Sequence, residues 1–303
     1  MLQRDIFIKE ITKRLKTDKS IFFLSADFGA MALDELREKY PNNFLHCGIS
    51  EQAMLDIASG LALMDKKVFV YAMAPFISLR AIEQIKCGPG LMDLPICVIS
   101  TGIGLGYADA GPTHYATEDL SCIRSISGNT IITPSDNNIT KYTAISLLNK
   151  PKFSYIRLDR EPTAEIHKDF TQQDYDNGYK IIGDLRSDKI ALISHGKILQ
   201  KCVEITQKAP DKYFCVDLFR CKPISAKLIK NLSVCKKIVC IDEQTSSGNL
   251  SSIVFEEFAK TSYNPQIKNV SLPDNYIFEN GGRNYLLDKH GLSKIDIEKK
   301  CQF

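Results

Sequence analysis

The stretch HCGISEQAMLDIASGLALMDKKVFVYAM, residues 46–73, places a helical pattern directly before an apolar strand. The residues that share one face of the 3.6-residue repeat are Glu51, Leu55, Ala58 and Ala62. The run KVFVYAM at 67–73 is short, rich in β-branched and aromatic side chains, and suited to a buried strand. A helix that leads into such a strand is the repeating unit of a parallel sheet, so the stretch predicts an α/β fold.

The same alternation of apolar runs and helical patterns continues along the chain. Further strands are expected at 21–27, 95–101, 130–135, 153–158, 189–196, 213–219 and 237–243. Further helices are expected at 2–16, 76–87, 117–126 and 137–149. The polar segment 166–182 lacks a sustained apolar period and is interpreted as a linker. The sequence therefore predicts two doubly wound, mostly parallel-sheet domains, at 1–165 and 183–303.

Composition limits the classes of protein to which the chain can belong. Its 303 residues are 44% hydrophobic and 25% charged, which is typical of a globular protein. The net charge of +3 is too small to favour nucleic acid, and no apolar run is long enough to span a membrane. The ten cysteines form no C-x-x-C pair, and the N-terminus lacks the features of a secretory signal. We therefore expect a cytoplasmic protein without a cysteine metal site.

Glu51 stands at the head of the apolar face of its helix, which directs the carboxylate inward. Burial penalises the charged form of an acid and suits it to exchange a proton with a ligand nitrogen. The alternative is a solvated glutamate in the first helical turn, after Ser50 as the N-cap, where its charge favours the helix dipole. The helical pattern by itself favours this alternative.

A glycine-rich stretch, TGIGLGYADAGPTHYATEDL at 101–120, follows one of the expected strands. Its glycines let the backbone approach a ligand, or permit turns with positive φ, but their spacing does not match the G-x-G-x-x-G dinucleotide fingerprint. In open α/β sheets ligands bind beyond the carboxyl ends of strands. His114 is therefore a candidate hydrogen-bonding or proton-relaying group, although a lone histidine after a proline turn is more often an ordinary loop residue.

Several segments together resemble the transketolase family. GISEQAMLDIASGLAL at 48–63 is similar to the motif around its catalytic glutamate, and YADAGPTHYATEDLSCIRSISGNTIITPSD at 107–136 is similar to its GPTH segment. VDLFRCKPIS at 216–225 and SLPDNYIFENGGRNYLLDKHGLSKIDI at 271–297 resemble the C-terminal domain of transketolases and deoxyxylulose-phosphate synthases. The resemblance implies a pyrimidine-binding domain, a transketolase C-terminal domain, and thiamine diphosphate as the cofactor.

The family's motif for the cofactor's diphosphate is missing from the sequence. Family members carry a G-D-G followed farther along by an asparagine, whereas the one Gly-Asp here, Gly183–Asp184, continues with Leu185. The resemblance therefore implies a partner subunit that holds Mg²⁺ and the diphosphate, in an α₂β₂ assembly. The second domain is then expected to provide dimer contacts rather than to bind a nucleotide near His195 and Gly196.

The resemblance also implies roles for individual residues. The glutamate that corresponds to Glu51 bonds to N1′ of the cofactor's aminopyrimidine and acts as general acid and base towards it. Phe76 matches an aromatic position that stacks on the pyrimidine, and Met73 stands in the same wall. Asp27 corresponds to an acid that lines the cofactor and substrate channel, and His114 to a histidine that contacts the donor's hydroxyl or carbonyl oxygen. For Phe76 the alternative is a plain core position, and for Asp27 a turn cap.

Arginines near the end of the first domain resemble a phosphate site. Arg160 matches an arginine that binds substrate phosphate, and Arg157 is its neighbour in the sequence. Arg80 is a weaker candidate for a cofactor contact. The alternative is that Arg157 and Arg160 pair with Asp159 and Glu161 on a solvated surface.

Departures from the family pattern concern the substrate. Where transketolases carry an aspartate before the glycine of GPTH, this chain has Ala110, with Asp109 one place earlier in a longer loop, and Ser100 replaces a histidine. A methyl group cannot accept the hydrogen bond of a sugar hydroxyl, and such a loss strongly changes discrimination between substrates. We therefore expect transfer of a two-carbon ketol unit from a ketose to an aldose, on a non-standard, modified or nucleotide-linked sugar.

Two other functions fit parts of the sequence. The β subunit of a 2-oxoacid dehydrogenase E1 component shares the two domains and the glutamate, but the GPTH segment favours a transketolase. A non-catalytic structural subunit would keep the fold alone. Glu51, Phe76 and His114 are all present, and an idle subunit has no use for a buried acid.

Overall fold

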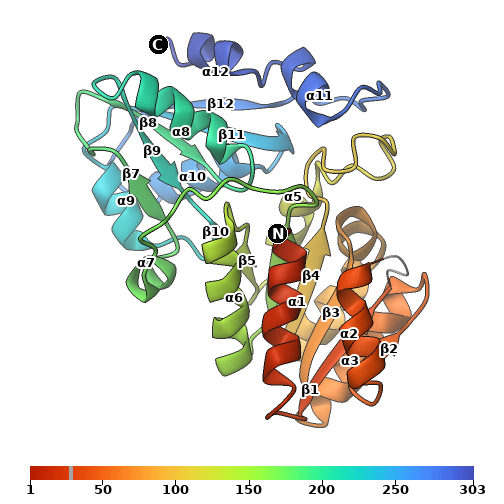
Figure 1. The fold of residues 1–303 in the computed structure, drawn as a ribbon. Helices are drawn as coiled ribbons and strands as arrows, with labels where there is room; N and C mark the ends of the chain where they lie inside the picture. Colours follow the sequence, from red (N-terminus) through yellow and green to blue (C-terminus); the bar gives the residue numbers. More distant parts are fainter. Residues whose placement is uncertain (27–29) are drawn as a thin grey trace.

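The computed structural model describes residues 1–26 and 30–303, and in it the chain forms two sheets, each with helices on both faces (Figure 1). The strands of the first sheet are β1 (Ile21–Ser25), β2 (Phe44–His46), β3 (Lys67–Met73), β4 (Ile96–Thr101), β5 (Thr130–Ile132), β6 (Ser154–Leu158) and β10 (Arg220–Lys222). They lie in the order β10-β5-β6-β4-β3-β1-β2 and are parallel except for β10. The strand predicted at 67–73 is confirmed at both ends.

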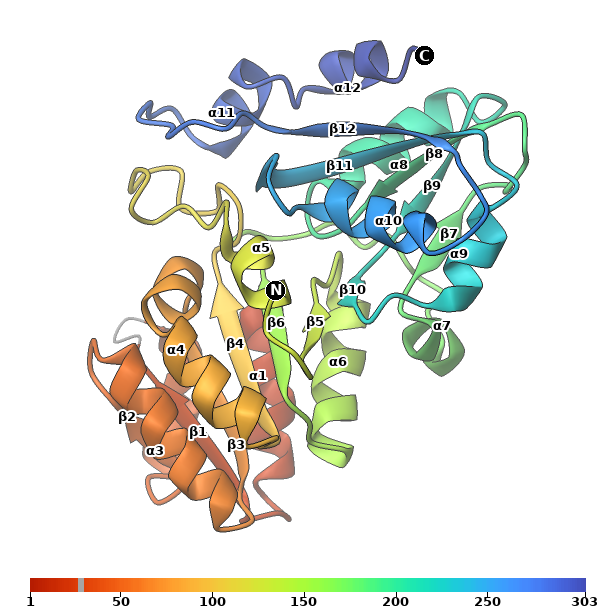
Figure 2. The same ribbon diagram turned by 180° about the vertical axis from the view of Figure 1, so that it is seen from behind.

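Helices cover both faces of the first sheet because its strands are apolar on both sides. These helices are α1 (Gln3–Arg14), α2 (Asp34–Lys39), α3 (Glu51–Leu63), α4 (Ile82–Ile85), α5 (Asp119–Arg124) and α6 (Asn137–Asn149). Phe69 and Tyr71 of β3 pack in the core with α1 and α6, whereas Val68 and Val70 pack with α3, α4 and α5. Figure 2 shows α3 and α4 in front of the sheet, with α1 behind it.

The second sheet is built in the same way. Its strands are β7 (Lys180–Ile182), β8 (Ile190–Ser194), β9 (Tyr213–Asp217), β11 (Lys237–Thr245) and β12 (Gln266–Leu272), in the order β12-β11-β8-β9-β7. Its helices are α8 (Leu199–Lys208), α9 (Ala226–Leu232), α10 (Leu250–Ala259), α11 (Arg283–Lys289) and α12 (Lys294–Lys300). Apolar clusters fill both faces, so the predicted class of two doubly wound, mostly parallel sheets is confirmed. Within the described ranges, no helix has both the length and the apolar character needed to cross a membrane.

The segment 166–182, expected as a linker, does pass between the two sheets but also has structure of its own. It forms α7 (Gln172–Asn177) and then β7, which pairs antiparallel with β9. Thr171 and Asp174 form a capping box at the start of α7, and Gly178 ends it with a φ of +79°. Because six residues give fewer than two helical turns, the apolar period of such a helix is too short to recognise.

The helix expected at 76–87 is divided in the structure. π-helical turns at Phe76–Arg80 and Lys86–Leu91 stand on either side of the short α4. A π-helical turn contains more residues than an α-helical turn and is frequent at functional sites. The first of these turns places Phe76 and Arg80 beside the start of α3.

Candidate active site

Glu51 is the first residue of α3, and only 3% of its side chain is exposed. Arg80 donates from Nη1 to Glu51 Oε2 at 2.6 Å. Ser50 precedes the helix, but its hydroxyl donates to the Cys47 carbonyl at 2.5 Å instead of accepting from the helix. Glu51 is therefore an inward-facing acid with a cationic partner, and the alternative of a solvated charge at a helix end does not apply.

The ring of Phe76 connects this acid to His114. The guanidinium of Arg80 lies 4.5 Å from the centroid of the Phe76 ring. The His114 ring meets the Phe76 ring in a T-shaped arrangement, with the centroids 5.2 Å apart. Met73 ends β3 three residues earlier and is partly buried. A partly exposed aromatic ring between a buried acid and an imidazole gives a surface on which a flat ligand ring can stack.

Glu51, Arg80, Phe76 and His114 form a row of contacting side chains. Through Tyr107, the glycine-rich loop extends this row to Arg160. Gly102 has a φ of +80°, and a Cβ there would lie 2.0 Å from the Tyr107 ring, so glycine is required where that ring folds back. The Tyr107 ring lies 6.2 Å from the His114 ring, and the guanidinium of Arg160 lies 4.3 Å from its centroid. Arg160 Nη1 also donates to Asp109 Oδ1 at 3.0 Å. The backbone N–H of Asp109 itself and the Arg160 guanidinium lower the pKa of the Asp109 carboxyl.

The second sheet holds the loop that carries His114. Gln244 in β11 donates from Nε2 to the Ala116 carbonyl at 2.7 Å, and its Oε1 accepts from the Leu120 backbone N–H at 3.3 Å. The neighbouring Glu243 accepts from the Leu105 backbone N–H at 3.4 Å. Neither residue was predicted from the sequence. The sequence does carry a signal for Glu243 and Gln244, because they are polar residues at the end of an apolar strand. Such residues lie at the carboxyl edge of a sheet, where ligands and loops are bound.

The structure does not bring Arg157 or Ser100 to this surface. Arg157 is 1% exposed and donates to both carboxylate oxygens of Asp119, at 2.8 and 3.0 Å, and to Thr133 Oγ1 at 3.0 Å. Ser100 is fully buried and donates to the Ile156 carbonyl at 3.0 Å. Both side chains belong to buried strands, where successive residues point to opposite faces. The prediction that Arg157 stands beside Arg160 at a phosphate is therefore corrected, and Ser100 is a strand-to-strand contact.

The predicted residues that do come together are Glu51, Arg80, Phe76, His114, Arg160 and Asp109, with Met73 nearby. Asp27, the remaining candidate, lies outside the described residues. In residues 1–26 and 30–303, no three His, Cys, Asp or Glu side chains lie close enough together to hold a metal ion. The row thus offers a buried carboxylate, a ring face, an imidazole and a partly exposed guanidinium to an organic, anionic ligand.

Comparison with known proteins gives a family match and several relatives. Residues 2–164 match the family described as transketolase, pyrimidine binding domain. The chain is 24% identical to one subunit of the apulose-4-phosphate transketolase of Phocaeicola vulgatus, over 97% of this chain and 96% of that protein. It is 28% identical to transketolase-like protein 1 of Mus musculus, over 88% of this chain but 45% of that protein.

A solved structure shows the same fold over the whole chain. It is described as a split gene transketolase, inactive beta4 tetramer, and superimposes with a TM-score of 0.84 over 100% of this chain and 97% of that one, at 22% identity. The chain therefore spans nearly all of a separate transketolase subunit and about half of a longer relative. The family match covers more than half of the sequence and includes Glu51, Phe76 and His114. The chain belongs to the transketolase family through its pyrimidine-binding domain.

Proposed function

We propose that the chain is one subunit of a two-component, thiamine diphosphate-dependent transketolase that transfers a two-carbon ketol unit from a ketose to an aldose. The observation that carries the proposal is the contact of buried Glu51 with Arg80 over the Phe76 ring. In this arrangement a planar cation with N–H donors stacks on an aromatic ring and bonds to a carboxylate. The aminopyrimidine ring of the cofactor is also planar, and with N1′ protonated it would be a cation with an N–H donor at that position.

The residues present fit the pyrimidine half of the cofactor. Glu51 would donate to or accept from the ring nitrogen N1′, and Phe76 would stack on the ring, with Met73 in the same wall. Arg80 would leave Glu51 and turn towards solvent, which its partly exposed side chain permits. When bound, thiamine diphosphate supplies the nucleophile and the electron sink for cleaving a carbon–carbon bond beside a ketone.

His114 would act on the substrate. Its Nδ1 lies 3.0 Å from Thr113 Oγ1, so Nε2 is the ring nitrogen that can bond to a substrate oxygen. The edge contact with Phe76 holds the imidazole beside the surface on which the pyrimidine would stack. A positioned imidazole stabilises charge that develops on a hydroxyl or carbonyl oxygen in the transition state.

Arg160 is the group that would recognise the substrate's phosphate. Its guanidinium and its partner Asp109 are both exposed, so the ion pair can open for a ligand at little cost. Ala110, next to Asp109, offers no acceptor to a sugar hydroxyl. These features support a sugar other than the usual pentose phosphates, whether modified or nucleotide-linked, and one relative is named for apulose 4-phosphate.

A partner subunit would complete the enzyme. The sequence lacks the G-D-G and asparagine motif, and the chain matches nearly the full length of a protein named as one subunit of a transketolase. We propose that a second chain holds Mg²⁺ and the diphosphate, in a cytoplasmic α₂β₂ assembly. The site would then lie between two chains.

The proposal is tested by reconstitution with a partner that carries that motif. Glu51→Gln should lower ketol transfer by roughly 10²–10⁴-fold without changing assembly, because the amide cannot exchange a proton with the ring nitrogen. The control is Glu257→Gln on α10, where the carboxylate pairs with Lys260 at the end of the same helix. Full activity in the Glu51 variant would refute the proposal.

The assays also separate the alternative functions. Turnover of pyruvate with an artificial electron acceptor would identify a 2-oxoacid dehydrogenase subunit. Rates typical of transketolases with xylulose 5-phosphate and ribose 5-phosphate would refute the proposal of a non-standard sugar. The isolated chain should bind thiamine diphosphate weakly, and the reconstituted pair should bind it tightly with Mg²⁺.

A further inference from the structure

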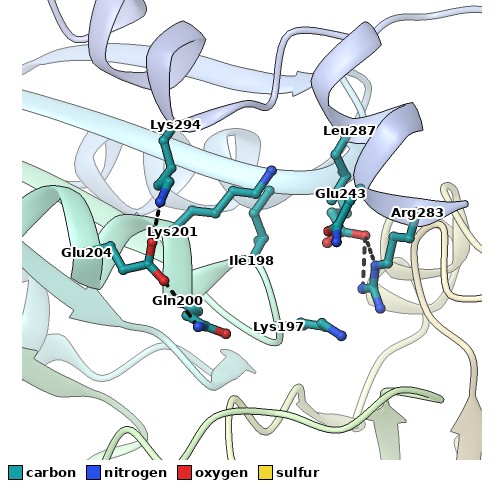
Figure 3. A pocket seen from close by; sticks show the side chains of 10 residues that line it. Lys197, Ile198, Gln200, Lys201, Glu204, Glu243, Arg283, Leu287 and Lys294 are labelled. Carbon is teal, nitrogen blue, oxygen red and sulfur yellow. Dashed lines mark hydrogen bonds and ion pairs between the residues drawn. The ribbon is translucent and has the colours of Figure 1, made fainter.

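A cavity of about 330 Å³ opens between α8, α11 and α12 at the carboxyl end of the second sheet (Figure 3). Two neighbouring strands end beside it, since Lys197 and Ile198 follow β8 and Glu243 lies near the end of β11. From β8 the chain passes to β9 on one side, and from β11 it passes to β12 on the other. Open α/β sheets bind ligands at such a switch point.

Most of the residues that line the cavity are polar, and each of the four cations among them also pairs with a carboxylate. The basic side chains are Lys197, Lys201, Arg283 and Lys294, and the carboxylates are Glu204 and Glu243. The amides of Gln200 and Asn284 add donors and acceptors, and few apolar side chains contribute. The volume is at the lower end of the range for small-molecule sites, roughly 300–1,000 Å³. The lining suits a small, hydroxylated anion.

Two of the lysines can turn to a new anion. Lys201 Nζ donates to the Leu292 carbonyl at 2.8 Å and lies 3.3 Å from Asp288 Oδ1. Lys197 donates to Glu161. The side chain of Asp288 is 59% exposed and that of Glu161 is 37% exposed, so water solvates both carboxylates when the lysines leave. Neither lysine therefore leaves a buried carboxylate without a partner when it turns to the anion.

Arg283, by contrast, is fixed in the wall. Its Nη1 donates to Asp159 Oδ1 at 2.8 Å and its Nε donates to Glu243 Oε2 at 3.0 Å. Burial opposes the charge on the guanidinium, but the two carboxylates outweigh burial and raise the pKa of Arg283. The wall therefore stays charged.

We propose that this cavity binds a small phosphorylated molecule with hydroxyl groups, such as a sugar phosphate. The phosphate would lie between Lys197 and Lys201, with Lys294 at the opposite wall. The hydroxyl groups would bond to the amide of Gln200 and the carboxylate of Glu204, which line the cavity together; Gln200 Nε2 donates to Glu204 Oε1 at 3.1 Å and Lys294 donates to Glu204 Oε2 at 2.7 Å. This site is separate from the row of Glu51, and it does not depend on the proposed transketolase activity.

The test is calorimetric titration of the full chain with glucose 6-phosphate and with glucose. Glucose 6-phosphate should bind, whereas glucose at the same concentration should not. Lys201→Met should weaken binding by about tenfold or more, because a hydrogen bond to a charged group is lost. The matched control is Lys208→Met on the same helix, where the lysine is 73% exposed and pairs with Glu298 outside the cavity.

Further variants keep the test decisive. Lys294→Met, at the half-exposed end of α12, should weaken binding if Lys201→Met disturbs folding. Arg160→Gln serves to locate the ligand, because a loss of binding in that variant would place the ligand at the candidate active site. The proposal is overturned if neither glucose 6-phosphate nor inorganic phosphate binds, or if Arg160→Gln abolishes binding while the two lysine variants keep it, which would place the ligand at the candidate active site.

Discussion

The buried pair of Asp119 and Arg157 gives a prediction whose size follows from the structure. Asp119 is fully buried and accepts two bonds from Arg157 and one from the Tyr155 hydroxyl, at 2.9 Å. Asp119→Asn keeps the volume but removes the charge and turns one acceptor into a donor that faces the guanidinium. Arg157 is then left with Thr133 and an amide.

Removing one partner of a buried ion pair costs about 3–5 kcal/mol, a large share of the roughly 5–15 kcal/mol by which domains are stable. At about 2–4 °C per kcal/mol, the melting temperature should fall by roughly 6–20 °C. Burial opposes the charge on Arg157, but Asp119 and, more weakly, Asp242 outweigh it and raise the pKa of the guanidinium. Because this second carboxylate still attracts the guanidinium in the variant, we expect the lower half of that range.

The assay is thermal unfolding of the full chain, followed by circular dichroism at a fixed pH near neutrality. The double variant Asp119→Leu with Arg157→Met should recover most of the loss, since apolar residues can replace a buried pair without penalty. In the reconstituted enzyme this double variant should also keep the wild-type KM, because Arg157 does not reach the site. A melting temperature of Asp119→Asn within measurement error of the wild type would refute the buried pairing.

Three further predictions concern acid stability, the substrate and the cofactor. The hydrogen bond from Lys67, with those from Ser20, lowers the pKa of Asp18 from 3.8 to about 2. The ionised carboxylate therefore stabilises the fold at pH values above 3.8, and this contribution is lost as the pH falls towards 2. The difference in denaturant stability between wild type and Asp18→Asn should therefore close between pH 4 and 2, and a gap that persists at pH 2 would contradict this. His114→Asn should lower kcat/KM for the donor by about 10²-fold with the cofactor's Kd unchanged; a matching loss of cofactor affinity would move His114 to the cofactor. Phe76→Leu should weaken thiamine diphosphate binding in the reconstituted complex by about 1 kcal/mol, measured by titration, and an unchanged Kd would exclude stacking on this ring.

Local patterns predicted most of the longer elements of the first sheet, whereas β12, α8 and α10 of the second were not predicted. The helix expected at 137–149 has those bounds, because Asp136 caps it through its side chain and its apolar residues follow one face. The apolar pattern at 76–87 predicted a helix but did not reveal the π-helical turns at Phe76–Arg80 and Lys86–Leu91. An apolar repeat of only a few turns cannot distinguish an α-helix, with about 3.6 residues per turn, from a π-helical turn, which has more. The strand β10 was missed because three residues carry no pattern.

The candidate site could be predicted only where the position of a residue depends on local sequence. The inward direction of Glu51 follows from its place on the helix face, and the structure confirms that it is buried. Arg157 was misplaced because its partner Asp119 lies 38 residues away in the sequence, and nothing local shows which arginine of the segment turns inward. The contacts of Gln244 with the loop of His114 join segments more than 120 residues apart, so only the folded chain reveals them.

The short strand β10 makes the boundary between the two sheets a poor place to cut the chain. Arg220 and Lys222 pair with Ile132 and Ile131 at the edge of the first sheet. In the sequence, however, both residues follow β7, β8 and β9, which belong to the second sheet. A fragment that stops before β7 would leave β5 as an open edge, which is a template for aggregation. A fragment that keeps β5 paired must therefore extend through β10, beyond the pyrimidine-binding domain, and removal of the segment that carries β10 exposes an edge of the first sheet.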